Sequence, residues 1–245
     1  MRAVTLAARF ERMETPHYRF IGRGLYSLGE AHRLTGVPKR SIRRWISGYQ
    51  FPYIGSIRHS APVVVSDLPG EIGLPALDFA DLIEVRFLHA FRAHGVSWKA
   101  IRIASDRARE LLGLNHPFSS RKFSTDGHTI LAQFVTETGD EVLLDLVRSQ
   151  YEFKRIISSY LFGEIDFDEA DAPKRWFPVA GSRRIVIDPQ RALGAPIVSR
   201  GGVPTRILAK AVEVEKSVQV VSSLFEIDAA SVEEAYRYEL SRIAE

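Results

Sequence analysis

Residues 26–45 limit the fold more than any other stretch, because they encode two short helices joined by one tight turn. Ser27 and Glu30 have the spacing of a capping box, in which each side chain satisfies a free backbone N–H at a helix start. Gly36 follows an apolar helical face and suits the turn between two helices that cross at a steep angle. This pattern predicts a helix-turn-helix, with its turn and its second helix anchored by apolar residues: Val37, Ile42 and Trp45.

The second predicted helix carries four positive side chains on the faces that its apolar anchors leave outside: Lys39, Arg40, Arg43 and Arg44. In a helix-turn-helix, the first turn of the second helix reaches base edges in the major groove, and later residues reach phosphates. We therefore assign base contacts to Lys39 and Arg40, and phosphate contacts to Arg43 and Arg44. A helical hairpin with a basic face and no role in DNA binding remains the alternative interpretation.

The charge of the chain is concentrated at its start. Residues 1–60 hold 11 Lys and Arg against 3 Asp and Glu, a net charge of +8, although the whole chain has a net charge of only +3. The remainder is therefore net acidic. This asymmetry favours a front end that binds a polyanion and a back end with a different role.

Composition excludes several classes of function. The chain has no cysteine, which rules out disulfides, cysteine-based zinc sites and thiol catalysis. None of the seven histidines has the spacing of a metal ligand, and no phosphate-binding loop or Ser–His–Asp set is evident. We expect no metal, no cofactor and no enzyme activity. Without an apolar run of about 18 residues or a signal peptide, a cytoplasmic protein is expected.

The helix-turn-helix string resembles that of the MerR family of transcription regulators, which has the form Y-S-I-G-E-x-A-x-x-T-G-V-x-x-x-T-L-R-x-[WY]. The resemblance continues through LIEVRFLHAFRAHGVSWKAI at 82–101 and covers roughly residues 25–113. It implies a winged helix that binds a partly palindromic operator, usually as a dimer. It also adds Ser27 and Thr35 to the candidate DNA-binding residues. The matching residues are Tyr26, Ser27, Gly29, Glu30, Thr35, Gly36, Val37 and Arg43.

The wing of such a protein would be the hairpin that Gly, Pro and β-branched residues predict at 50–66, with Arg58 and His59 at its tip on the phosphates. This segment is longer than the family's wing and has an unusual sequence. The family's long dimerising helix is also not obvious, because the predicted helix at 97–112 stops at Gly113.

The C-terminal part has its own pattern. A short strand at 184–188, a loop rich in Gly and Pro, and three helices at about 204–213, 217–225 and 231–243 are expected, with Ser217 and Ser231 as N-caps. The loop resembles a domain of unknown function that occurs alone and at the C-terminus of VapB-type antitoxins, which pair with PIN-type ribonuclease toxins. The matching residues are Trp176, Pro178, Ile187, Asp188, Pro189, Gly194, Pro196, Gly201, Val203 and Pro204.

The expected fold is α+β and mainly α, with an N-terminal winged helix-turn-helix, a middle helix and β-hairpin region, and a C-terminal three-helix, helix-turn-helix-like domain. Apolar periodicity predicts helices at 79–93 and 150–162. Apolar runs predict a hairpin from strands at 128–134 and 142–147, with a helix start as the alternative for the second run. The expected divisions are a basic N-terminal segment (1–24), the MerR-like winged helix-turn-helix with its following helices (25–113), the middle hairpin-plus-helix region (114–163), an acidic linker (164–174) and the antitoxin-type domain (175–245).

Together these features predict an antitoxin that binds operator DNA as a homodimer, represses its own operon and neutralises a PIN-type, VapC-like ribonuclease. A cluster of carboxylates in such a nuclease would attract a positive side chain as a plug. The candidates, which could instead pair with Asp188 or the acidic residues 164–171, are Arg183, Arg184, Arg200 and Arg206.

Two other functions remain open. One is a MerR-like regulator that senses a small molecule in a pocket built from residues 114–162, and the other is a protein scaffold with no DNA role.

Overall fold

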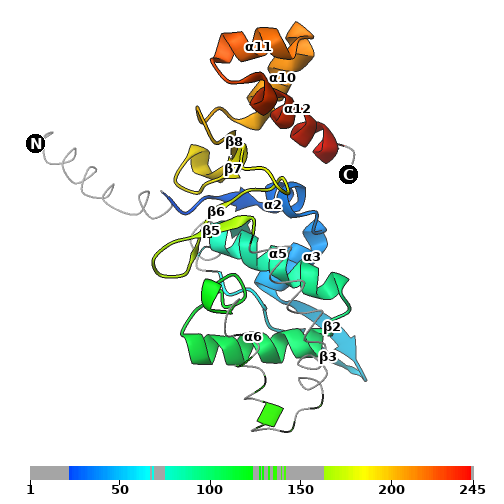
Figure 1. The fold of residues 1–245 in the computed structure, drawn as a ribbon. Helices are drawn as coiled ribbons and strands as arrows, with labels where there is room; N and C mark the ends of the chain where they lie inside the picture. The colour runs from blue at the N-terminus through cyan, green and yellow to red at the C-terminus, as the bar shows by residue number, and fades with distance from the viewer. Residues whose placement is uncertain are drawn as a thin grey trace, which may run out of the picture.

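The computed structural model describes residues 22–66, 68, 75–123 and 163–243, together with isolated positions between 124 and 141 (Figure 1). The predicted basic segment up to residue 21, the predicted strand at 142–147 and the predicted helix at 150–162 lie outside these residues. Among the helices that can be described, none combines the length and the apolar character that a membrane span requires.

The two helices predicted from the pattern at 26–45 are present. β1 (Tyr26–Ser27) leads into α2 (Leu28–Thr35), and α3 (Lys39–Ser47) follows after the turn. The capping box forms as predicted: the Ser27 side chain accepts the N–H of Glu30, and the Glu30 carboxylate accepts the N–H of Ser27. Gly36 ends α2 with a φ of 72°, a left-handed conformation that glycine adopts without strain.

A two-stranded hairpin follows α3. β2 (Tyr49–Tyr53) pairs antiparallel with β3 (Ser56–Ser60), and the hairpin projects from the body of the molecule beside α3 (Figure 1). Gly48 joins α3 to β2 with a φ of 70°, and a Cβ there would lie 2.5 Å from the backbone oxygen of Ser60. Glycine is therefore required where the chain leaves α3.

Two long helices form the centre of the molecule, at the positions that the sequence predicts. α5 (Phe79–Ala93) begins after β4 (Ala76–Leu77), which pairs with β1, and α6 (Trp98–Leu112) ends at Gly113. The Ser97 side chain caps α6 by accepting the N–H of Ala100. α5 buries side chains on most of its surface, so it lies inside the main core.

The segment predicted as an acidic linker at 164–174 is ordered into strands. β5 (Ile165–Phe167) pairs with β6 (Pro173–Trp176), and β7 (Ile185–Ile187) and β8 (Pro196–Val198) complete a four-stranded antiparallel sheet in the order β5-β6-β7-β8. Asp168, Glu169 and Asp171 lie in the turn between β5 and β6, whereas Glu164 is mostly buried and pairs with Arg86 of α5. Ile165 points inward and joins the main core, and this burial makes the segment a strand.

The strand predicted at 128–134 is wrong for the residues that can be described there, because Thr129 and Ala132 are helical. The Thr136 hydroxyl donates to the carbonyl of Ala132 at 3.0 Å, and the N–H of Gly139 donates to the carbonyl of Val135 at 2.8 Å. Both bonds have the four-residue spacing of a helix. A short apolar run fits a buried helix as well as a strand, so periodicity alone could not separate the two.

The C-terminal part ends in α10 (Thr205–Glu215), α11 (Val218–Phe225) and α12 (Ala229–Ile243), which pack around a small core of their own (Figure 1). The Ser217 side chain caps α11, as predicted. The predicted cap at Ser231 is wrong. α12 begins two residues earlier, and the Asp228 carboxylate accepts the N–H of Ser231 at 2.9 Å.

Candidate nucleic-acid interface

α3 has one buried face and one basic face. Ile42, Trp45 and Ile46 are buried, as the sequence predicts for the first two, and Val37 is fully buried in the turn before the helix. The four positive side chains predicted to contact DNA are all exposed: Lys39, Arg40, Arg43 and Arg44. None of the four forms a salt bridge with another residue that the structure describes. Their charge is therefore available to phosphates.

Contacts from both sides hold α3 in place. The ring of Trp45 meets that of Trp98 on α6 edge to face, with their centroids 5.3 Å apart. The Trp45 carbonyl accepts the N–H groups of Val63 at 2.8 Å and Val64 at 3.0 Å. These contacts fix the rotation of α3, so its first turn faces outward on a rigid support.

The hairpin lies next to this basic face and extends it. The guanidinium of Arg44 stacks on the ring of Tyr49 at 4.8 Å, which joins α3 to β2. Arg58 stacks on Tyr53 at 4.1 Å. Arg58 and His59 are exposed, but they do not lie at the tip as predicted: their partners in the ladder are Phe51 and Gln50.

The tip of the hairpin is apolar. Ile54 begins the turn with a φ of 39° and is 87% exposed, and Ile57 is 76% exposed. The sequence-based prediction placed only cations at the tip of the wing, so it did not include these two isoleucines. An exposed pair of isoleucines beside cations is suited to a groove, where the apolar groups meet sugars and bases.

Ser27 and Thr35 have local partners that fix the ends of α2. The Ser27 hydroxyl donates to the Glu30 carboxylate at 2.9 Å. The Thr35 hydroxyl donates to the Ala31 carbonyl at 2.6 Å and accepts the N–H of Val37 at 3.2 Å. Both side chains therefore stabilise the helix-turn-helix, and their contacts with DNA stay a prediction.

A buried polar cluster holds the start of α5. The Asp81 carboxylate accepts a hydrogen bond from His116 Nε2 at 2.7 Å and another from the Ser66 hydroxyl. The Asp78 carboxylate accepts from Arg23 at 2.7 Å and from the N–H of Asp81 at 2.9 Å. The ligand atoms of Asp78, Asp81 and His116 lie within 4.8 Å of one another, as a metal site would need.

These ligand atoms already have partners within the chain, so the cluster acts as a hydrogen-bond network that positions α5. Sequence reasoning missed it because His116 is 35 residues from Asp81, and no local spacing connects them.

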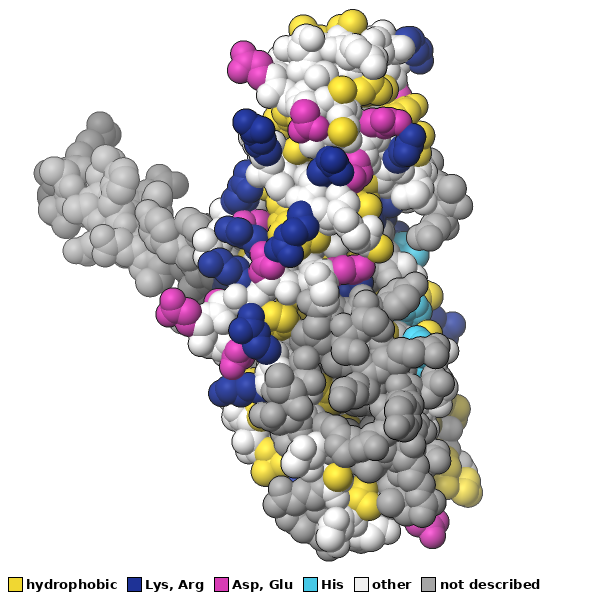
Figure 2. Space-filling view, viewed as in Figure 1, with side chains coloured by type: hydrophobic (Ala, Val, Ile, Leu, Met, Phe, Trp, Pro, Cys, Tyr) yellow, Lys and Arg dark blue, Asp and Glu magenta, His cyan; other side chains and the backbone are white. Residues whose placement is uncertain are grey.

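The four arginines predicted to contact a toxin fall into two groups. Arg183 pairs with Asp166 and stacks on Phe177 at 3.9 Å, and Arg184 pairs with Glu234 at 3.5 Å. Arg183 therefore pairs with one of the acidic residues at 164–171, which was the predicted alternative to a toxin contact. Arg200 and Arg206 are exposed and form no ion pair among the described residues. Figure 2 shows positive and negative side chains interspersed over the C-terminal helices.

Comparison with known proteins supports the helix-turn-helix and identifies relatives of most of the chain. Residues 24–105 match a protein family described as "Putative DNA-binding HTH domain". The chain is 32% identical over 189 residues to "Putative antitoxin VapB45" of Mycobacterium tuberculosis, and the alignment covers 73% of this chain and 78% of that protein.

A solved structure shares the fold. The crystal structure of Rv2018 from Mycobacterium tuberculosis superposes with a TM-score of 0.64 at 26% sequence identity, over 86% of this chain and 96% of that one. The predicted helix-turn-helix is thus supported by a matching family, and the predicted antitoxin by a relative that covers most of the chain. The chain belongs to the VapB45 antitoxin family.

Proposed function

We propose that this chain is the antitoxin of a type II toxin–antitoxin system, without catalytic activity of its own. It binds operator DNA as a homodimer, represses its own operon and neutralises a PIN-type ribonuclease. Membership of the antitoxin family supports the partnership with a toxin, and the exposed cations of α3, which form no salt bridge among the described residues, support the binding of DNA. That basic face is the single observation that carries the DNA-binding role.

In this proposal, α3 enters the major groove with its first turn foremost. Lys39 and Arg40 reach base edges, and Arg43 and Arg44 contact phosphates on either side. The hairpin follows the neighbouring backbone with Arg58 and His59, and its apolar tip enters the adjacent groove. One such unit covers a short half-site, so two copies on half-sites about 34 Å apart would supply the affinity.

A double substitution on α3 tests the DNA-binding role. Arg40→Ala with Arg43→Ala removes one proposed base contact and one phosphate contact, so binding to the DNA upstream of the gene should weaken by about 2–5 kcal/mol. Both side chains are exposed, so the fold should persist. Fluorescence anisotropy with a labelled duplex measures the affinity, which should fall steeply with salt for the wild type.

The control removes the same charge elsewhere. Lys210 and Arg237 are exposed on α10 and α12, and their joint replacement by alanine should leave DNA affinity within a factor of about two. The proposal is wrong if the α3 double variant also binds within twofold of the wild type.

The toxin contact is proposed to centre on Arg200. Arg183 and Arg184 are held in ion pairs, whereas Arg200 lies exposed on a turn before two glycines with φ values of 94° and 75°. A turn of this kind presents a side chain to a partner with little steric hindrance. Arg206 is also exposed and lies at the start of α10.

Charge reversal at this turn tests the contact in the full-length chain. Arg200→Glu should weaken binding to the proposed PIN-type ribonuclease partner by at least about tenfold, because carboxylates would then face carboxylates. Calorimetry measures the affinity, and Arg237→Glu is the matched control on an exposed helix face. Unchanged affinity of the Arg200→Glu variant would contradict the proposal that Arg200 enters the carboxylate cluster of the nuclease. DNA binding should be retained in both variants.

A further inference from the structure

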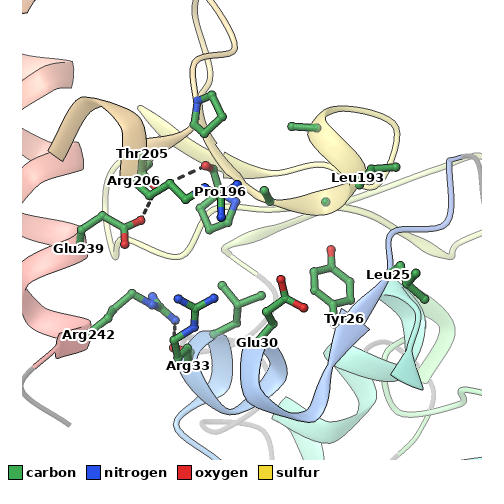
Figure 3. Close-up of a pocket in the computed structure, with 15 residues that line it drawn as sticks. Leu25, Tyr26, Glu30, Arg33, Leu193, Pro196, Thr205, Arg206, Glu239 and Arg242 are labelled. Carbon is green, nitrogen blue, oxygen red and sulfur yellow. Dashed lines mark hydrogen bonds between the residues drawn. The ribbon is translucent and has the colours of Figure 1, made fainter. Parts of the chain in front are cut away.

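A cavity of about 280 Å³ lies where α2 faces the C-terminal part of the chain (Figure 3). Its walls come from three regions: β1 with α2, the loop around the short 3-10 helix η4 (Ala192–Gly194), and the helices α10 and α12. The N–H of Leu25 donates to the carbonyl of Leu193 at 3.4 Å across this junction. The cavity therefore lies between the DNA-binding unit and the C-terminal helices.

Three arginines line the cavity, one each from α2, α10 and α12: Arg33, Arg206 and Arg242. Figure 3 shows Arg33 and Arg242 close together, and Arg242 donates a hydrogen bond to the carbonyl of Arg33. None of the three forms an ion pair with another described residue. Guanidinium groups that approach one another without a carboxylate between them repel, unless an anion joins them.

Two carboxylates also line the cavity, but each has a local partner. Glu30 belongs to the capping box of α2, and Glu239 accepts a hydrogen bond from the Thr205 hydroxyl. With three guanidinium groups and two engaged carboxylates, the lining is net positive. About half of the lining residues are apolar or glycine, including Leu25, Leu34 and Leu193, so the cavity also offers a surface for a non-polar body.

Tyr26 forms part of the cavity wall. Its side chain is only 2% exposed, and its hydroxyl is buried against the backbones of Gly24 and Gly194. Burial raises the pKa of Tyr26, so the hydroxyl stays protonated and adds no negative charge to the wall.

We propose that this cavity binds a small anion that carries a phosphate or carboxylate group. The three arginines would hold the anionic group through charge-assisted hydrogen bonds. A molecule bound here would connect α2 to α10 and α12, and so would fix the position of the DNA-binding helices relative to the C-terminal helices. This site goes beyond the proposed antitoxin function and differs in place from the middle-region pocket considered from sequence.

Calorimetry of the full-length chain with sodium pyrophosphate and, separately, with citrate tests the site and distinguishes a phosphate group from carboxylates. We expect one of the two to bind the wild type, and Arg33→Gln with Arg242→Gln to weaken that binding at least tenfold. Lys210→Gln with Arg237→Gln removes equal charge from exposed positions outside the cavity and should leave it unchanged. Binding that survives the cavity double variant, or no binding of either anion to the wild type, would overturn the proposal.

Tyr26→Phe is the second variant, and it keeps the shape of the wall. Without an anion, its melting temperature should equal or exceed that of the wild type, because an unpartnered hydroxyl has been removed. Its affinity for the bound anion should stay within about twofold of the wild type, because the buried hydroxyl does not reach the cavity. A several-fold loss of affinity in this variant would show that the anion depends on the wall and not on the arginines, and would contradict the proposal.

Discussion

Tyr26 shows how one side chain sets the distance between two parts of the molecule. Its hydroxyl lies against the backbone of Gly194, which has a φ of 83°, and of Gly24, which has a φ of 70°. A Cβ at either glycine would clash with the phenol ring. Glycine is therefore needed at both positions, for its backbone conformation and for the close approach.

His116 is a second residue whose role depends on distant partners. Burial alone would lower its pKa, but the hydrogen bond to Asp81 and the nearby carboxylates of Glu84 and Asp78 raise it above the ordinary value of 6.5. Burial raises the pKa of Asp78 and of Glu84 as well. The folded protein therefore holds protons in this cluster at a pH at which the unfolded chain releases them.

The stabilisation from His116 should consequently depend on pH. Because the folded pKa is raised, the contribution is fully present below pH 6.5 and is lost as the pH rises through the folded value. His116→Gln should lower the free energy of unfolding by about 1–3 kcal/mol at pH 6, and by less at pH 9. Urea unfolding at both pH values measures the difference, with His59→Gln on the exposed hairpin as a control. A loss of unfolding free energy in His116→Gln that is the same at pH 6 and pH 9 would contradict a raised pKa of His116 in the folded protein.

Helices whose ends are marked by capping residues could be predicted from sequence, whereas elements that form only through tertiary contacts could not. α2, α5 and α6 begin after capping side chains, and α2 and α6 end at glycines in the left-handed region, so their bounds follow from short-range chemistry. The acidic segment around β5 has no such signal. It became a strand because Ile165 reaches the core and β6 supplies hydrogen bonds.

The basic face of α3 could also be predicted from the sequence of that element alone. The apolar spacing determines which side of the helix is buried, so the exposure of its four cations followed from sequence. The residues at the tip of the hairpin could not be predicted in this way, because the position of the turn decides which residues project. The turn at Ile54 and Gly55 places Arg58 within β3 instead of at its end.

At the scale of the whole molecule, one core extends across the expected domain boundary. Trp176 and Ile187 of the four-stranded sheet belong to the same buried cluster as Ile42 of α3 and Leu82 of α5. The guanidinium of Arg86 on α5 pairs with Glu164 and stacks on the Trp176 ring at 4.7 Å. The sheet therefore completes the core of the N-terminal part.

A chain that ends at Gly163 should for this reason be unstable. It would lose the buried side chains of Ile165, Trp176 and Ile187 and would leave Arg86 without its carboxylate partner. Losing one buried aromatic side chain typically costs about 3–5 kcal/mol, which is a large part of the stability of a domain. Thermal unfolding followed by circular dichroism should show a strongly lowered or absent transition. A truncated chain that melts within a few degrees of the full chain would show instead that the boundary is a true domain limit.

The sequence by itself determined the helix-turn-helix, its capping box, its turn glycine and the cations of α3, because each depends on residues within about one or two helical turns of one another. Tertiary structure alone decided the rest. Arg33 and Arg242 meet across 209 positions, His116 reaches Asp81 across 35, and Arg183 reaches Asp166 across 17. No local period encodes such pairs. They form because burying the shared core brings these segments together, and the cavity, the polar cluster and the ion pairs are created at the places where they meet.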